Sequence, residues 1–249
     1  MSTVAARRRR GRVLWGVAGG VLLLLIALIG WVCFRAVQAS QELSALVPMV
    51  AEAQSAASAG DSDRIDELLT DVGTHAGRAA ELTSGPLWHA AEIVPVLGQN
   101  LAAVRVVSEQ LSATADAVTG PAQALLGSEQ GTVDILSLRA QEAPLAAAAV
   151  ALGTARDELG TIQTDVLLPP LAKGVSRLSE VLDTLTPAMD GLARAAAVVP
   201  GLAGADGPRT ILVMLQNPAE LRTGGGITGL FAEIRAEDGV FTLVRQADS

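Results

Sequence analysis

The sequence predicts a mainly α-helical protein. An N-terminal transmembrane helix continues into an extracytoplasmic helical bundle or stalk, followed by the first β-strands of an incomplete α/β domain. Three patterns support this prediction. Residues 13–33 are almost entirely apolar, residues 34–200 place apolar side chains at helical spacing, and residues 210–249 contain short runs typical of strands. The glycine-rich residues 201–209 are expected to link the last two parts.

A basic tail and an uncharged segment define the N-terminus. Residues 1–12 carry five arginines and no acidic residue, and residues 13–32 carry no charge at all. At about 1.5 Å per residue, a helix of this length spans the roughly 30 Å hydrocarbon core of a bilayer. Trp15 and Trp31 lie near its ends, where indole rings prefer the interface. The positive-inside rule then predicts a single-pass protein of the cell membrane, with a cytoplasmic N-terminus and an extracytoplasmic bulk.

A cleaved signal peptide is the alternative interpretation of this segment. Residues 37–39, Val-Gln-Ala, form a weak match to a cleavage site. The apolar part of a signal peptide is usually about 7–15 residues long, which is shorter than the segment found here. A retained anchor is therefore favoured. Cys33 is the only cysteine, so the chain can form no internal disulfide.

Charge and composition restrict the class of partner. The net charge of −8 becomes −13 once the five arginines of residues 1–12 are set aside. An acidic body argues against nucleic-acid binding, which requires a positive surface. His75 and His89 are far apart and have no paired ligands nearby in sequence, so neither a metal site nor a cofactor is expected. Outside the cytoplasm, the partners available are envelope polymers, lipid-linked sugars, peptides and other proteins.

The first half of the bundle is expected to contain long amphipathic helices. An apolar stripe over residues 37–50 continues the membrane helix outward until residues 60–62, Gly-Asp-Ser, where Asp61 or Ser62 can cap the next helix. Apolar residues three, four and seven positions apart then form a helical seam over residues 97–118. Gly120 and Pro121 are expected to end that helix.

The second half of the bundle continues the pattern. Alanine-rich residues 145–159 predict a helix, Pro169 and Pro170 break the chain, and residues 175–185 predict a further helix that Pro187 bends or ends. Such helices joined by short turns predict an antiparallel bundle or stalk. The bundle either spaces another domain from the membrane and mediates oligomerisation, or it is itself a binding surface. The lack of a cluster of acidic, histidine or cysteine residues at ligand spacing favours the spacer.

Residues 85–105, GPLWHAAEIVPVLGQNLAAVR, are less generic than the rest of the bundle. Pro86 suits the first turn of a helix, Pro95 is expected to end that helix, and residues 98–100 mark a turn or a helix start. Trp88 is a large aromatic residue in a chain that has few. We expect it to fix the corner between two helices.

The pattern changes to strands after residue 209. Residues 210–215, TILVML, predict a buried strand, Asp238 and Gly239 predict a hairpin turn, and residues 240–244 predict the strand that follows it. Residues 227–235 alternate between two faces. One face carries Leu230, Ala232 and Ile234, and the other carries Phe231, Glu233 and Arg235.

The connection between the first two strands contains a possible nucleotide-binding pattern. Gly224, Gly226 and Gly229 have the spacing G-x-G-x-x-G. A dinucleotide-binding loop requires these glycines to open a helix directly after a strand, whereas here several residues intervene and a strand follows. The glycines are therefore expected to serve the backbone, by allowing positive φ and close approach of another segment.

The same loop is the candidate anion-binding site. Arg222 could make a bidentate contact with a phosphate group, supported by the neighbouring polar and glycine residues. Alternatively, Glu220 and Arg222 pair with each other and fix the loop. The sequence leaves both interpretations open, and no catalytic residue is assigned. The candidate residues are Asn217, Glu220, Arg222, Gly224 and Gly225.

Two motifs resemble one bacterial family. Residues 207–244 resemble the start of the conserved domain in the family catalogued as domain of unknown function 4012, whose members are membrane-anchored envelope proteins frequent in actinobacteria. The family pattern is a strand ending in Gln-Asn, then Ala-Glu-Leu-Arg and two glycines, with Pro218 here as a minor departure. Residues 85–105 also resemble the helical region of actinobacterial members. The matching residues of the first motif are Gln216, Asn217, Ala219, Glu220, Leu221, Arg222, Gly224 and Gly225.

The resemblance implies a structural or binding role in envelope or exopolysaccharide biology. The partners it implies are the lipid bilayer and an envelope glycopolymer or its lipid-linked precursor. The family is also distantly similar to the LytR-CpsA-Psr proteins, which transfer glycopolymers from lipid pyrophosphate carriers. The alternative is therefore a phosphoglycosyl transferase in which Arg222 holds a phosphate. Since Ser249 ends the chain after three predicted strands, we expect a fragment that is inactive by itself.

Overall fold

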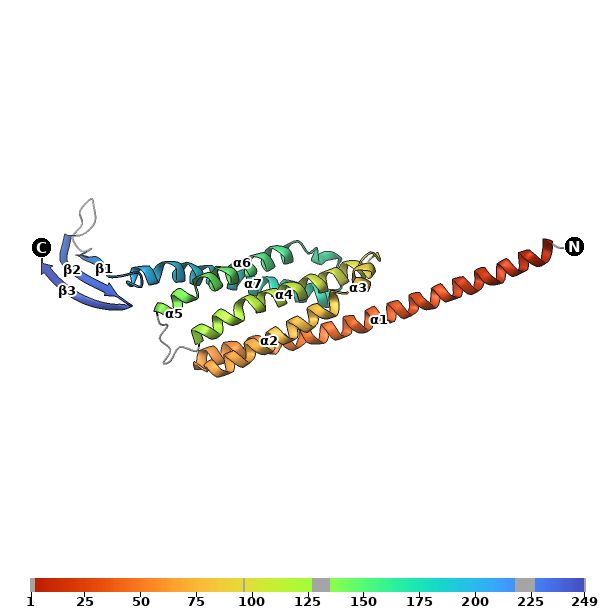
Figure 1. Cartoon of the computed structure of the whole chain (residues 1–249), viewed down its shortest axis with the longest axis horizontal. Coiled ribbons are helices and arrows are strands. Elements are labelled where there is room, and N and C mark those ends of the chain that lie inside the picture. Colours follow the sequence, from red (N-terminus) through yellow and green to blue (C-terminus); the bar gives the residue numbers. More distant parts are fainter. Residues whose placement is uncertain (1–2, 96, 127–134, 218–226, 249) are drawn as a thin grey trace.

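The protein is elongated, with a helical bundle between a projecting helix and a small sheet (Figure 1). The structure, a computed structural model, describes residues 3–95, 97–126, 135–217 and 227–248. Helix α1 (Thr3–Ala59) extends far beyond one end of the bundle, and the strands lie at the other end, so the two termini are at opposite ends. Among the described residues, no helix combines the length and the apolarity needed to cross a membrane.

The helices follow one another up and down the bundle. Helix α1 packs against α2, α2 against α4, α4 against α6 and α6 against α7, so each long helix contacts the next long one in the chain. This arrangement confirms the predicted helical bundle. The remaining described helices are α2 (Ser62–Thr83), α3 (Pro86–Ala91), α4 (Leu97–Leu126), α5 (Ile135–Ala140), α6 (Glu142–Gly160), the short 3-10 helix η2 (Thr164–Val166) and α7 (Pro169–Leu202).

Several helix ends agree with the sequence signals. Helix α1 ends directly before Gly60, whose φ of +69° favours glycine, and Asp61 caps α2 by accepting a hydrogen bond from the backbone N–H of Arg64 at 3.1 Å. Helix α7 begins at Pro169. A backbone N–H at the first position of a helix has no acceptor within the helix, so proline, which lacks this group, loses no hydrogen bond there.

One predicted helix end is wrong, and one of the two outcomes expected at another proline is excluded. Helix α4 continues through Gly120 and Pro121 to Leu126. Pro187, expected to bend or end its helix, does not end it, because α7 continues to Leu202. A proline inside a helix costs about 3 kcal/mol because it removes one hydrogen bond and crowds the preceding turn. Buried residues lie on both sides of Pro187, Leu182 before it and Ala196 after it. Packing of the helix on both sides of the proline outweighs that local cost.

The core of the bundle is built from leucine, valine and alanine. Its main cluster joins α4, α6 and α7, with Leu43 of α1 packed against its edge. Alanine side chains at several contacts let the helices approach closely, which agrees with the alanine-rich composition. The fully or nearly buried members of the main cluster are Ala103, Val107, Leu152, Ala155, Leu159, Leu167, Val175 and Leu182.

The described strands form an antiparallel sheet in the order β1-β2-β3, with the strands where the sequence predicts them. The first is not buried as expected, because Leu212, Met214 and Leu215 are each more than half exposed. The strands are β1 (Arg209–Asn217), β2 (Ile227–Glu237) and β3 (Val240–Asp248). The predicted turn joins β2 to β3, with positive φ at Asp238 (+49°) and Gly239 (+79°). Register irregularities occur between Leu215 and Gln216 and between Glu233 and Ile234.

The hairpin turn of the sheet docks on the end of α7. The backbone N–H of Gly239 donates to the carbonyl of Ala203 at 2.9 Å, and Arg139 of α5 forms an ion pair with Asp206. Gly204 lies so close to β2 that a Cβ atom there would be 2.4 Å from the carbonyl oxygen of Ala236, and its φ is +84°. The segment predicted as a linker is therefore held by backbone contacts where it meets the sheet.

Candidate functional site

The loop predicted to bind an anion falls between two described strands. Glu220, Arg222, Gly224 and Gly225 lie outside the described residues, and Asn217 is described only as the backbone end of β1. Asn217 is paired with Ile227, so the loop leaves and re-enters the sheet at neighbouring positions. Because the opposite end of the sheet docks on α7, these two positions lie at the end of the sheet that faces away from the bundle (Figure 1).

The two faces of the sheet differ as the alternation of β2 predicts. Leu212, Glu233 and Arg245 share a cross-strand row on one face, where Arg245 donates to Glu233 at 3.0 Å. The other face is largely apolar. It contains the row Ile211, Ile234 and Leu243, together with Val213, Leu215, Leu230, Ala232 and Phe241. Phe241 and Leu243 are each more than half exposed, so the described residues leave the β3 side of this face uncovered.

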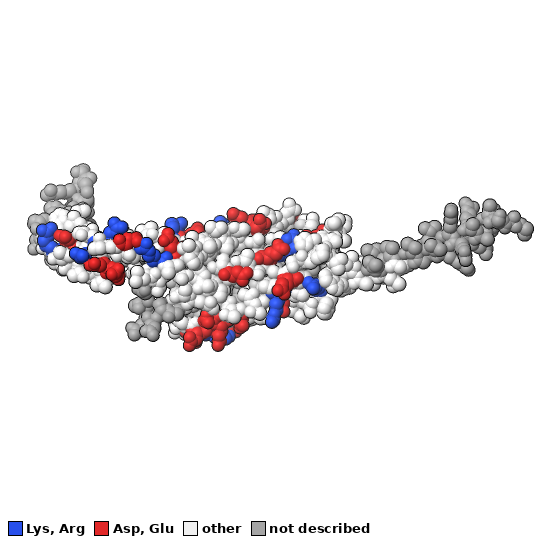
Figure 2. All heavy atoms as spheres, in the orientation of Figure 1, with Lys and Arg blue, Asp and Glu red and all other residues white. Residues whose placement is uncertain are grey.

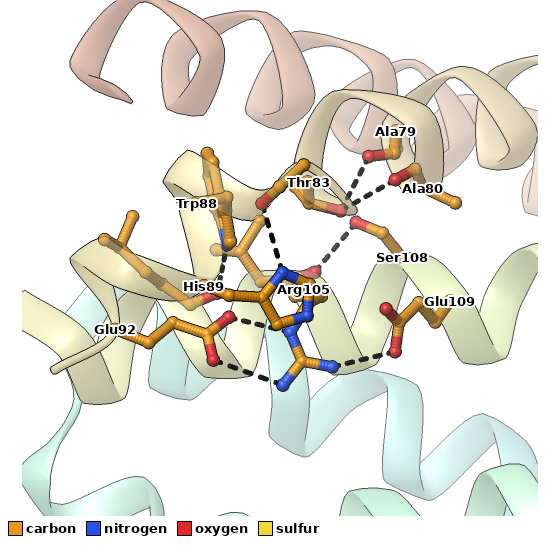
Figure 3. Close-up of polar contacts among 12 residues, drawn as sticks. Ala79, Ala80, Thr83, Trp88, His89, Glu92, Arg105, Ser108 and Glu109 are labelled. Carbon is orange, nitrogen blue, oxygen red and sulfur yellow. Dashed lines mark hydrogen bonds and ion pairs between the residues drawn. The ribbon is translucent and has the colours of Figure 1, made fainter. Parts of the chain in front are cut away.

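The corner between α3 and α4 contains a buried tryptophan and a group of polar contacts (Figure 3). Trp88 is fully buried, and its indole Nε1–H donates to the carbonyl oxygen of Leu101 at 3.2 Å. It packs against Leu101 and Val32, so one side chain joins α1, α3 and α4. This confirms that Trp88 fixes a corner between helices.

A close backbone approach completes the corner. Helix α3 already ends at Ala91, before Pro95, and α4 starts at Leu97. A Cβ atom at Gly98 would be 1.8 Å from the carbonyl oxygen of Glu92, so this position accepts only glycine without a shift of the backbone.

A charged network crosses the outer side of the same corner. Arg105 of α4 donates from Nε to one oxygen of Glu92 at 2.7 Å, from Nη2 to the other at 3.3 Å, and from Nη1 to Glu109 at 2.9 Å (Figure 3). The hydrogen bonds that Arg105 donates to Glu92 are the main cause of the raised pKa of its guanidinium. Sequence reasoning missed this network, because only the sharp turn after α3 brings Glu92 and Arg105 together.

A shallow cleft lies between α1 and α2. Arg35 crosses it by donating to the carbonyl oxygens of Glu81 and Leu82, both at 3.2 Å, and its guanidinium lies 4.8 Å from the centre of the Trp31 ring. His75 Nδ1 is 2.5 Å from Glu42 on the same side of the hairpin. No group of three or more metal-ligating side chains occurs among the described residues. The cleft has a volume of about 310 Å³ and is lined by Arg35, Gln38, Gln41, Glu42, Arg78, Glu81 and Leu82.

Comparison with known families gives one match. Residues 206–249 match the family described as "Protein of unknown function (DUF4012)", which supports the family resemblance seen in the sequence of the strands. The match covers the three strands and the residues directly before them. No curated protein and no solved structure matches the chain.

Proposed function

We propose that this chain is a membrane-anchored stalk of the cell envelope, with a structural or binding role. In this proposal residues 13–33 cross the cell membrane once, the N-terminus is cytoplasmic and the bulk of the chain is extracytoplasmic. The observation that carries the proposal is the continuity of α1, which runs without a break from Thr3 through this segment into the bundle. The anchor and the stalk would then share one helix.

The surface of the projecting part of α1 supports the anchor. Leu22, Leu23, Ile26 and Ile29 are each more than half exposed, whereas a helix end in water normally carries polar side chains on its free surface. In a bilayer such side chains contact lipid, so burial of this apolar surface favours insertion. The arginines of residues 1–12 set the orientation.

The sheet supports the binding role. It lies at the end of the bundle farthest from the N-terminus, with its outer strand ends free of the helices (Figure 1). A stalk of this form would hold the sheet away from the membrane surface, where an envelope glycopolymer or its lipid-linked precursor could reach it. The same proposal includes the resemblance of this sequence to actinobacterial envelope proteins and its distant similarity to LytR-CpsA-Psr proteins.

The topology can be tested with reporter fusions. A phosphatase that is active only outside the cytoplasm would be fused after Gly60, and a matched fusion after Arg12 would serve as the cytoplasmic control. We expect activity from the first fusion alone, together with retention of the full chain in membranes washed with alkaline carbonate. An inactive fusion after Gly60 would contradict the proposed orientation.

A second candidate function is transfer of a phosphoglycosyl group, and it rests on Arg222 in the loop between β1 and β2. Purified full chain in detergent would be titrated with a polyprenyl pyrophosphate. Arg222→Ala is expected to weaken binding several-fold, whereas Arg245→Ala, on the exposed surface of β3, is expected to leave it unchanged. Equal binding by both variants, or no binding at all, would exclude this candidate.

A further inference from the structure

The end of the bundle from which α1 projects is formed by two connections. One is α3 with the turn that follows it, residues 86–97, and the other is the α6–α7 connection, residues 161–168. The backbone N–H of Leu168 donates to the side-chain oxygen of Asn100 at 2.8 Å, which ties the second connection to the start of α4. Both connections therefore lie at the same end of the bundle (Figure 1).

Large apolar side chains are exposed on both connections. Ile93 is 83% exposed and Leu168 is 59% exposed, values that are high for residues of this kind. Glu92 and Asp165 are the only charged residues of the two segments, and Glu92 is held by Arg105. We call this surface the apolar rim. It consists of Leu87, Ile93, Val94, Leu97, Val166 and Leu168.

The turn at the opposite end of the bundle that joins α1 to α2 has the reverse character. The turn between α1 and α2 carries Asp61 and Asp63, and Arg64 beside them forms ion pairs with Glu52 and Glu67. Figure 2 shows acidic side chains gathered over this turn. This turn is also a short connection between two long helices. Exposure of a connection therefore does not by itself explain why the rim is apolar.

Contacts with α1 fix the level of the apolar rim along that helix. Trp88 of α3 packs on Val32, and Arg35 bonds to the last carbonyls of α2. Val32 lies near the end of the uncharged segment, three residues before Arg35, the first charged residue after Arg12. A bilayer has an interfacial layer of about 5–8 Å outside each side of its hydrocarbon core. The rim is thus level with the place where the proposed anchor leaves the hydrocarbon core.

We propose that the apolar rim is a lipid-contacting surface that dips into the interfacial layer of the bilayer. It would give the bundle a second attachment to the membrane besides α1, and two attachments would restrict tilting of the stalk. The inference rests on the proposed membrane anchor. Apolar residues of α1 on either side of Val32, Ile29 and Phe34, are also more than half exposed.

Site-directed spin labels on the full chain test the proposal. In a Cys33→Ala background, single cysteines would replace Val94 or Leu168 in the rim, Leu23 in the anchor and Ser58 near the opposite end of the bundle. The labelled proteins would be placed in vesicles of phosphatidylcholine and phosphatidylglycerol. Accessibility of each label to oxygen, which enriches in lipid, would be compared with accessibility to a water-soluble nickel chelate.

We expect labels at Val94 and Leu168 to favour oxygen several-fold over the label at Ser58, and to lie shallower than the label at Leu23. Suppose that the label at Leu23 favours oxygen while both rim labels are as accessible to the chelate as the label at Ser58. The inference about the rim is then wrong, and the proposed membrane anchor is retained. If Leu23 is open to the chelate, the anchor itself is wrong. Rim labels shielded from both reagents would indicate a protein partner and would also overturn the inference.

A charge substitution gives a second, independent readout. The double variant Ile93→Glu, Val94→Glu places two carboxylates on the rim, and Val150→Glu places one on an exposed side of α6 as the matched control. We expect the double variant to lose most of the oxygen preference at Leu168 while Leu23 keeps its own. The control should change neither. Because all three side chains are exposed, the helical content should stay unchanged, and an unaltered Leu168 signal in the double variant would contradict lipid contact.

Discussion

The helical bundle and the sheet are built from similar apolar side chains but are stabilised differently. In the bundle, residues from α4, α6 and α7 enclose one another, and Trp88 is fully buried at the α3–α4 corner. In the sheet, Phe241, Leu243 and Leu212 remain more than half exposed, and the attachment to the bundle consists largely of backbone contacts around Gly204.

This difference predicts that the bundle is more stable than the sheet. A helical bundle can bury its apolar residues between neighbouring helices. A small sheet with two open faces has no second layer to pack against. The bundle should therefore unfold as one cooperative unit, and the sheet should open locally at lower free energy. Four substitutions test this contrast, each measured on the full chain in detergent.

Trp88→Ala should have the largest effect. Removing a fully buried aromatic side chain typically costs about 3–5 kcal/mol, and here it also removes the contact between α3 and α1. Circular dichroism during denaturant titration should show a large fall in the midpoint of bundle unfolding. Trp88→Phe keeps most of the packing and should cost clearly less. Equal midpoints for Trp88→Ala and the unmodified protein would show that the corner does not stabilise the bundle.

Gly98→Ala should have the next largest effect. The added methyl group would meet the carbonyl of Glu92 at 1.8 Å, and relieving such an overlap typically costs about 1–3 kcal/mol. Gly153→Ala is the matched control, since a Cβ atom there meets nothing within 4 Å and alanine favours a helix interior. Opposite shifts of the two thermal midpoints are expected, and a shift of the same sign would contradict the close approach.

Arg105→Met should have a smaller effect on the bundle. It leaves Glu92 and Glu109, which are partly buried, without their partner, at a typical cost of about 1–3 kcal/mol. The raised pKa keeps Arg105 charged at every physiological pH, so its contribution should be constant from pH 6 to 9. Arg156→Met removes an exposed ion pair with Asp183 and should leave the midpoint unchanged. An equal fall in the unfolding midpoint of both variants would show that the partial burial of the Arg105 network does not add to the stability of the bundle.

Gly204→Ala should have the smallest effect on the bundle and a local effect on the sheet. Its Cβ would overlap the backbone of β2, so the hairpin should separate from the end of α7. Hydrogen exchange followed by mass spectrometry should show faster exchange in β2 and β3, with exchange in α4 and α6 unchanged. Gly201→Ala, whose Cβ meets only Asp206 at 3.9 Å, is the control. Faster bundle unfolding, or faster exchange throughout α4 and α6, would contradict separate stabilities.

Local patterns in the sequence were enough to predict most elements. The apolar spacing predicts the bundle helices, the Gly-Asp-Ser break separates α1 from α2, and the Asp-Gly pair predicts the turn between β2 and β3. These signals are short in range, because capping, turn conformation and side-chain alternation depend on residues within one or two turns of each other. The predicted helix end at Pro121 was wrong for the same reason, and Pro187 does not end α7, since the local cost of a proline can be outweighed by distant packing partners.

The sequence by itself determined the order of helices and strands, the uncharged segment near the N-terminus and the role of Trp88 at a corner. Only the tertiary structure decided that Glu92 binds Arg105, that Gly204 holds the sheet to α7, and that exposed apolar side chains gather on the end of the bundle beside Val32. These features join residues from separate elements. Their positions follow from how the helices pack, and packing depends on all the buried contacts together and not on any one stretch of the chain.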